Sequence, residues 1–174
     1  MKVTSDGIIN GKIQDKYGKR GTQKNVAGIP TYSLPLKFED APAGTVTYAL
    51  IMEDRDAVPV CGYSWIHWCA ANIRRTELLE NESITATDYV QGTSSDSGAI
   101  AKIDRGLVST YTGMAPPDKP HTYTIHVFAL DTVLPLERGF YMNELYLSLI
   151  HIFIRRHFLL GAERQARMHM QIII

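Results

Sequence analysis

The chain has 174 residues, and its 18 basic and 18 acidic side chains cancel to a formal net charge of zero at neutral pH. A chain without a basic face lacks the field that draws proteins to DNA, RNA or anionic membranes, so nucleic acid is excluded as an expected partner. No stretch approaches the ~20 apolar residues of a membrane helix, and the first residues show no apolar signal segment, so we expect a cytoplasmic protein without integral membrane contact.

Glycines and prolines interrupt the first 42 residues, and this composition favours short strands joined by turns over any helix. The interrupting residues are Gly7, Gly11, Gly18, Gly21, Gly28, Pro30, Pro35 and Pro42. Within this region Thr31–Phe38 is typical of an extended segment, with Pro35 at an edge or bulge. Residues Ala41–Gly44 then predict a turn.

The two strongest strand patterns follow. Thr45–Met52 is rich in β-branched and aromatic residues and too short for a typical helix, so it predicts a central strand. Trp65–Ile73 predicts the next strand, and because side chains alternate, one of its faces should carry every second residue. These residues are Trp65, His67, Cys69 and Ala71.

Less regular sequence separates these strands from the next pattern. Arg74–Glu80 could form one or two helical turns, and Asn81–Gly98 predicts a polar loop. Prolines prevent regular structure up to Pro120, and His121–Leu130 then has strand composition. Alternation in that strand would place His121 and Tyr123 on one face, just beyond a rigid loop.

The chain has one long helical pattern, near its end. Asn143 can cap a helix that continues to Leu160, with Gly161 as its stop. The helix is apolar nearly all round, which predicts deep burial or a partner surface. A second copy of the chain could supply that surface.

Several groups could carry chemistry, although each also has a purely structural explanation. Asp54 and Asp56 follow the first central strand, yet such a pair is more often a solvated turn. His67 is explained equally well as a core histidine bonded to the backbone. The stronger signal is His121 with Tyr123, because two polar side chains on one strand face need partners or water.

Other chemistries are disfavoured by missing patterns. Cys61 and Cys69 are unsuitably spaced for zinc and are expected to be free, packed thiols; with no metal-binding spacing present, we expect no metal or cofactor. No Gly-x-Ser-x-Gly elbow or nucleotide-binding glycine loop occurs, and nothing marks Ser64 or Ser109 as a nucleophile. A small pocket of imidazole, phenol and turn amides remains, and it suits a phosphate-like anion.

Three blocks of sequence together resemble the phosphatidylethanolamine-binding protein family, in its bacterial Raf-kinase-inhibitor-like branch. They are Tyr48–Ala57, Trp65–Trp68 and Gly113–Tyr123, and their order and approximate spacing match over most of the chain up to Leu147. The resemblance implies a mainly β fold, an antiparallel β-sandwich with a few short helices including a C-terminal one. This domain would span residues 1–160, and residues 161–174 would be a tail whose register does not follow the family.

The resemblance also implies a pocket for phosphate or phospholipid headgroups. Position by position, its ligand-binding residues would be Asp54, Asp56, His67, Ala115, Pro117, His121 and Tyr123. The family has no established reaction, and its members are described as lipid-headgroup binders and as inhibitors of kinases or serine proteases. We therefore expect non-enzymatic binding of a small anion, with inhibition of a kinase or protease as the alternative and hydrolysis as a third function.

The loop after the first central strand departs from the family pattern. Arg55 stands where the motif has proline, and Val58 lengthens the loop before Pro59, so the two carboxylates can point differently from those of the family. Ala115 replaces a glycine of the family's Pro-Pro loop. In the expected site Asp56 orients a histidine, and anion affinity rises as the pH falls through about 6.5.

Overall fold

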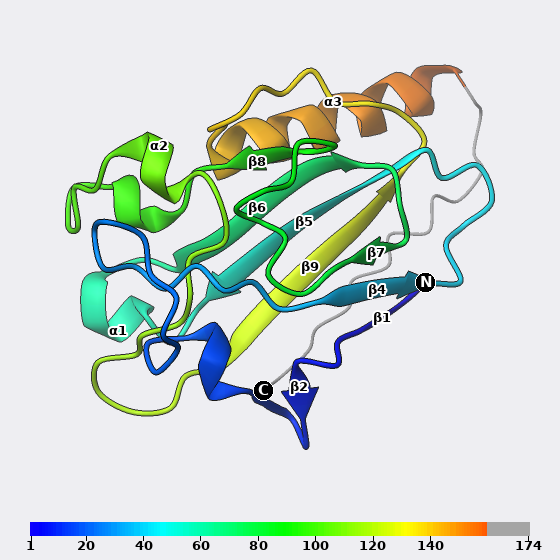
Figure 1. The fold of residues 1–174 in the computed structure, drawn as a ribbon. Helices are drawn as coiled ribbons and strands as arrows, with labels where there is room; N and C mark the ends of the chain where they lie inside the picture. Colours follow the sequence, from blue (N-terminus) through cyan, green and yellow to red (C-terminus); the bar gives the residue numbers. More distant parts are fainter. Residues whose placement is uncertain (160–174) are drawn as a thin grey trace.

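A four-stranded antiparallel sheet forms the centre of the fold, in the computed structural model that describes residues 1–159 and side chains up to residue 150. Its strands, in spatial order, are β8 (Val90–Gly92), β6 (Trp65–Ile73), β5 (Thr47–Asp54) and β9 (Tyr123–Leu130). Figure 1 shows α3 (Met142–Leu159) on one side of this sheet and the strands β1, β4 and β7 on the other. The predicted tail at 161–174 and helix stop at Gly161 lie outside the described residues.

The second sheet and the connecting elements are short. The sheet pairs β1 (Lys2–Thr4), β4 (Leu36–Glu39) and β7 (Glu77–Leu78), and a separate hairpin pairs β2 (Ile8–Ile9) with β3 (Lys12–Ile13). The remaining elements are η1 (Asp15–Tyr17), α1 (Val58–Cys61), η2 (Ser95–Ser97) and α2 (Arg105–Val108). The prediction of a mainly β, antiparallel fold with few helices is confirmed.

Strand β5 is buried along its whole length because both of its faces contribute to a core. Leu50 and Met52 pack into the core shared with the smaller sheet, whereas Ala49 and Ile51 pack into the core beneath α3. This two-sided burial explains the continuous apolar run of the sequence. Leu145 is the fully buried anchor of α3 in the second core.

The described part of α3 is only partly covered. Leu147 and Ile150 are 53% and 47% exposed, so the apolar pattern does not mean burial on every side. The helix begins at Met142, and a Glu144 carboxylate oxygen accepts a hydrogen bond from the backbone N–H of Tyr141 at 2.7 Å. Asn143 is therefore the second residue of the helix, and the prediction that it caps the helix was wrong; Glu144 bonds back to the residue before the helix instead. No helix in residues 1–159 is long and apolar enough to cross a membrane.

The register between β5 and β6 contains a bulge that changes the predicted faces. Met52 pairs with Trp68, but Glu53 pairs with Ile66, so His67 is an extra residue between them. A bulge places two residues opposite one and interrupts the alternation of side chains. The prediction that His67 shares a face with Cys69 was therefore wrong: Cys69 joins Ile66 in the core beneath α3, and the His67 ring contacts Tyr123 of the other core.

Three predicted boundaries also differ from the structure. Arg74–Glu80 is not helical, because Leu78 is fully buried and pairs with Leu36 of β4, and such tertiary pairing outweighs local propensity. The loop predicted at Asn81–Gly98 contains β8 and η2. Strand β9 begins at Tyr123, so His121 lies in the loop before it.

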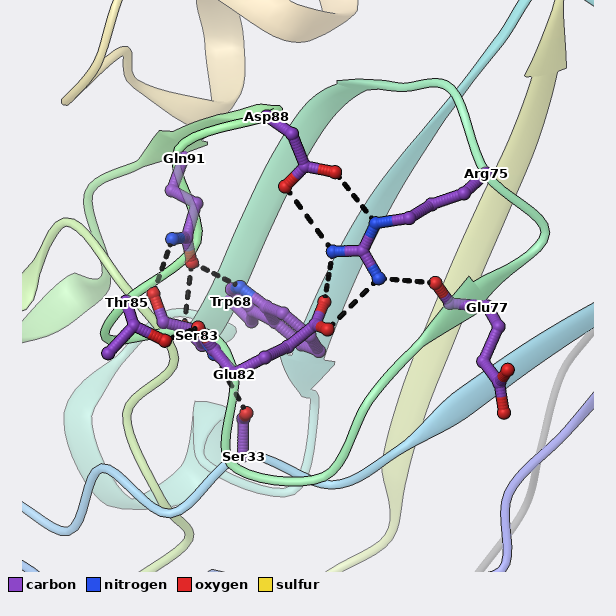
Figure 2. Close-up of polar contacts among 9 residues, drawn as sticks. All are labelled: Ser33, Trp68, Arg75, Glu77, Glu82, Ser83, Thr85, Asp88 and Gln91. Carbon is purple, nitrogen blue, oxygen red and sulfur yellow. Dashed lines mark hydrogen bonds and ion pairs between the residues drawn. The ribbon is translucent and has the colours of Figure 1, made fainter.

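A polar clamp holds the chain between β7 and β8 (Figure 2). The Arg75 guanidinium donates to both carboxylate oxygens of Glu82, at 2.9 and 2.5 Å, and to Asp88 at 2.7 Å. Deeper in the fold, Gln91 accepts from the indole N–H of Trp68 at 2.9 Å and from the Ser83 hydroxyl at 2.7 Å. These bonds fix β8 against β6 and so position the turn that follows β8.

Candidate functional site

A cavity of about 270 Å³ lies at the end of the central sheet where β5 ends and β6 begins. Its wall is assembled from five stretches of chain: residues 29–30, 54–61, 65–67, 96–100 and 113–121. Most of the wall is apolar. The ionisable side chains in it, apart from the Cys61 thiol, are Asp54, His67, Asp96 and His121.

The predicted site residues fall into two groups in the structure. Those that line the cavity are Asp54, His67, Ala115, Pro117 and His121. Asp56 and Tyr123 are outside the lining. The Asp56 carboxylate accepts a hydrogen bond from the backbone N–H of Thr122 at 2.7 Å, which holds the loop before β9. The Tyr123 ring packs edge-on against His67, with ring centroids 5.4 Å apart.

His121 lies between two carboxylates. Its Nδ1 is 2.7 Å from Oδ2 of Asp54, and its Nε2 is 2.8 Å from Oδ1 of Asp118. Burial lowers the pKa of His121, but the hydrogen bonds to Asp54 and Asp118 outweigh it, and the net shift is upward. An imidazole that donates to a carboxylate from both nitrogens is an imidazolium. Asp54, and not Asp56 as expected, therefore orients the histidine.

His67 has the opposite character. Its Nδ1 is 3.0 Å from the carbonyl oxygen of Thr112, and because a carbonyl can only accept, Nδ1 carries the proton. Burial lowers the pKa of His67, opposed by the Thr112 hydrogen bond. The ring is therefore neutral, with a lone pair on Nε2.

Two of the predicted site residues each carry a polar side-chain atom without a hydrogen-bond partner among the described residues. These atoms are Nε2 of His67 and the hydroxyl oxygen of Tyr123, and both are buried. Leaving a buried polar group unpaired costs about 1–3 kcal/mol, so such atoms usually mark a place for water or a ligand. Burial also raises the pKa of Tyr123, which keeps its hydroxyl protonated as a donor.

Sequence reasoning missed two acids: Asp96, which lines the cavity, and Asp118, which contacts His121. Asp96 is buried in η2, where its carboxylate accepts from the Ser94 hydroxyl at 2.8 Å. The neighbouring Ser95 hydroxyl accepts from the backbone N–H of Ile66 at 2.8 Å, which attaches this turn to β6. The run of small polar residues before Gly98 was the available signal. Asp118 was missed because it lies in the proline-rich loop.

A second polar cluster lies on the opposite face of β5. Glu53 accepts from His126 at 2.8 Å, from Nε of Arg55 at 2.9 Å and from the Ser64 hydroxyl at 3.0 Å. The His126 hydrogen bond is the largest effect that lowers the pKa of Glu53, to about 2. Arg55, which stands where the family motif has proline, forms an ion pair with Glu53, and its Nη2 is also 3.5 Å from Nε2 of His126.

The serines considered for nucleophilic chemistry bond to oxygen acceptors. Ser64 donates to Glu53 or to the backbone carbonyl of Asp54, and Ser109 donates to the carbonyl of Arg105 at 2.7 Å. Neither hydroxyl has a histidine as its base in these contacts. Among the described residues no group of three or more His, Cys, Asp or Glu side chains could hold a metal ion. Both cysteines are free, as predicted, with Cys69 buried and Cys61 partly exposed.

A family model described as phosphatidylethanolamine-binding protein matches residues 3–163 of the chain. Among curated sequences, the chain is 46% identical to the uncharacterised protein YxkA of Bacillus subtilis over 142 residues, covering 79% of this chain and 84% of the relative. It is 35% identical to a UPF0098 protein of Chlamydia pneumoniae over 164 residues, covering 92% and 97% of the two chains.

Solved structures of similar proteins share the fold. A putative phosphatidylethanolamine-binding protein homologue from Chlamydia trachomatis superposes with a TM-score of 0.64 and 31% identity, covering 84% of this chain and 85% of that one. YbcL of Escherichia coli, described as a new member of the mammalian phosphatidylethanolamine-binding protein family, gives a TM-score of 0.66 at 24% identity. The match covers 86% of this chain and 89% of that one. The second likeness bears on the fold alone.

Proposed function

Because the chain belongs to the phosphatidylethanolamine-binding protein family, we propose that it binds a small phosphate-like or headgroup-like anion in the cavity beside His67 and His121, without catalysing a reaction. Membership of the family supports a ligand-binding or regulatory role in general. The observation that carries the specific proposal is the buried Nε2 of His67 in the cavity wall, which has no hydrogen-bond partner within the described part of the chain. The Tyr123 hydroxyl also has no hydrogen-bond partner among residues 1–159, and the Tyr123 ring packs edge-on against the ring of His67.

Charge determines how such an anion would bind. The neutral His67 offers a lone pair at Nε2, so an anionic oxygen can pair with it only if a proton lies between them. That proton is taken up by His67 or is already carried by the ligand, as in the monoanion of a phosphate. In both cases, when the fully ionised ligand binds, the complex takes up one proton from solution. Affinity should therefore rise as the pH falls.

Non-enzymatic binding is favoured because the hydroxyls of Ser64 and Ser109 donate to oxygen acceptors. We also propose a cytoplasmic location, since a partly exposed free thiol such as Cys61 suits a reducing compartment. Inhibition of a kinase or protease stays a prediction, because no contact among the described residues bears on it.

Calorimetric titration with inorganic phosphate and with phosphoethanolamine, between about pH 5.5 and 8, tests the proposal around the ordinary histidine pKa. The informative variant is His67→Asn, because the shorter amide can still donate to the Thr112 carbonyl while Nε2 is removed. We expect it to weaken binding about tenfold, the effect of one lost hydrogen bond in a buried site. His126→Asn, on the opposite face of the sheet, is the matched control.

Two results would contradict the proposal. One is the absence of heat with either ligand at every pH, in a wild-type sample shown to be folded by circular dichroism. The other is turnover of generic phosphoesters or carboxylic esters that disappears in His67→Asn, because that would make the protein a hydrolase.

A further inference from the structure

Asp118 places a carboxylate on the outward nitrogen of His121. The Asp118 Oδ1 is 2.8 Å from Nε2 of His121, and the Asp118 side chain is 48% exposed whereas that of His121 is 1% exposed. A buried imidazolium therefore donates one hydrogen bond inward, to Asp54, and one outward, to a half-exposed acid of the loop before β9.

We infer that Asp118 is a specificity-determining residue: its carboxylate occupies the position on His121 Nε2 that the anionic oxygen of a ligand would take, and a singly charged oxyanion binds by displacing it. This inference rests on the proposed function. It follows from the geometry of His121, because Nδ1 is already directed to the buried Asp54. An anion that bonds to His121 must therefore use Nε2.

The two carboxylates on His121 differ in how easily they can leave. Asp54 is almost fully buried, and its second oxygen accepts a hydrogen bond from the backbone N–H of Ala57 at 3.2 Å. The Asp118 side chain reaches half into solvent and can be rehydrated when it turns away. Exposed ion pairs are weak for this reason. The ligand is therefore expected to replace Asp118 and leave Asp54 in place.

The Asp118 carboxylate also accepts from the backbone N–H groups of Asp118 and Lys119, but the loop on either side is held by bonds that do not involve this side chain. The backbone N–H of Lys19 donates to the carbonyl of Met114 at 2.8 Å, and the Lys19 ammonium donates to the carbonyl of Pro116 at 2.8 Å. On the other side, Thr122 donates to Asp56 at 2.7 Å. Rotation of the Asp118 side chain into solvent needs none of the bonds of Lys19 and Thr122 to break.

The charges around His121 restrict the class of ligand. When a singly charged anion replaces Asp118 on Nε2, the imidazolium still lies between two negative charges, as it does in the free protein. A dianion would add a further negative charge close to Asp54, and an unpaired charge in a buried site is costly. Carboxylates and phosphate monoanions are therefore preferred over phosphate dianions.

The test uses Asp118→Ala with two probes, sodium acetate and inorganic phosphate. Acetate reproduces the carboxylate that the substitution removes. At about pH 6, where an ordinary histidine is mostly charged, we expect the variant to bind each anion about fivefold more tightly than the wild type, because its site is no longer occupied internally. The Nε2 signal of His121, followed by proton–nitrogen NMR, should shift with acetate. Asp15→Ala, which removes an exposed acid paired with Arg20, is the control for net charge and should bind as the wild type does.

Each outcome decides a separate point. Equal affinity of wild type and Asp118→Ala for phosphate would overturn the role of Asp118 and leave the proposed function intact. Acetate bound on His121 of the variant, with no phosphate bound by either protein, would support Asp118 and overturn the phosphate-like ligand. Binding of neither anion by either folded protein would overturn both. If the alanine variant unfolds, Asp118→Asn keeps an acceptor without the charge, and it should show a smaller gain in the same direction; no gain would count against the inference.

Discussion

The Nδ1 atom of His121 lies 2.7 Å from Oδ2 of Asp54, and both side chains are almost completely buried. Asp54 is the last residue of β5, and it pairs with Tyr123 at the start of β9. The contact therefore joins two strand ends at the cavity, and it raises the pKa of His121.

Asp54→Asn should damage the site far more than Asp56→Asn does. Without the Asp54 charge the pKa of His121 falls, and the protein should lose roughly 2 kcal/mol of stability, in the range measured when a buried charged hydrogen bond is broken. Phosphate affinity should fall with it. Urea unfolding and calorimetric titration measure the two effects. In Asp56→Asn the side-chain carbonyl can still accept from Thr122, so both quantities should change little. Similar losses in the two variants would contradict the assignment of Asp54.

Folding should move the pKa values of the two cavity histidines in opposite directions. Folding raises the pKa of His121, so its stabilisation is present below about 6.5 and is lost as the pH rises through the folded value. Folding lowers the pKa of His67, so its stabilisation is present above about 6.5 and is lost as the pH falls through the folded value. NMR titration of the ring protons should give a pKa above the ordinary value for His121 and a pKa below it for His67.

His67→Asn supplies a stability test of the same point. Below about pH 6.5 the free energy of unfolding should fall less steeply with decreasing pH in this variant than in the wild type. Above about pH 6.5 its dependence on pH should be the same in both proteins. Denaturant unfolding over a series of pH values measures both. A pKa of folded His67 above its ordinary value would contradict this prediction, because it would show that burial is not the main influence on the ring.

Glu53 should contribute to stability at neutral pH through the cluster on the far face of β5. Its pKa is lowered to about 2, so its contribution is present above the ordinary value near 4.5 and is lost as the pH falls toward 2. We expect Glu53→Gln to cost roughly 2 kcal/mol at pH 7, less than half of that near pH 3 and little near pH 2. Glu39→Gln changes an exposed ion pair with Lys2 and is the matched control. A cost that does not depend on pH would point to packing rather than charge.

Arg75 should hold the segment between β7 and β8 by its paired hydrogen bonds, drawn in Figure 2. Arg75→Lys keeps the charge but loses the planar fork, so it should cost roughly 1–2 kcal/mol of stability. Amide hydrogen exchange near Tyr89 should accelerate. Arg20→Lys, in an exposed pair with Asp15, should have almost no effect. An unchanged exchange rate near Tyr89 would mean that Gln91 and Ser83 hold this segment without Arg75.

Composition predicted the central sheet because burial on both faces leaves a direct trace in the sequence. Trp65–Ile73 matches β6 at both ends, and Thr45–Met52 lies within two residues of β5 at each end. The helix near the chain end was likewise visible in its apolar repeat. The error at Arg74–Glu80 has a different origin, since the helix-favouring residues there are overruled by the pairing of Leu78 with β4.

The sequence by itself determined which strands are central, that both cysteines are thiols, and three of the five segments that border the cavity, because composition and turn residues act locally. Only the tertiary structure decided the partners within the site. The bulge at His67 depends on the register between two strands, and the choice of Asp54 over Asp56 depends on where β5 ends. The contact of Asp118 with His121 depends on how the proline-rich loop is held. Hydrogen bonds between residues far apart in the chain follow from packing, and no local pattern records them.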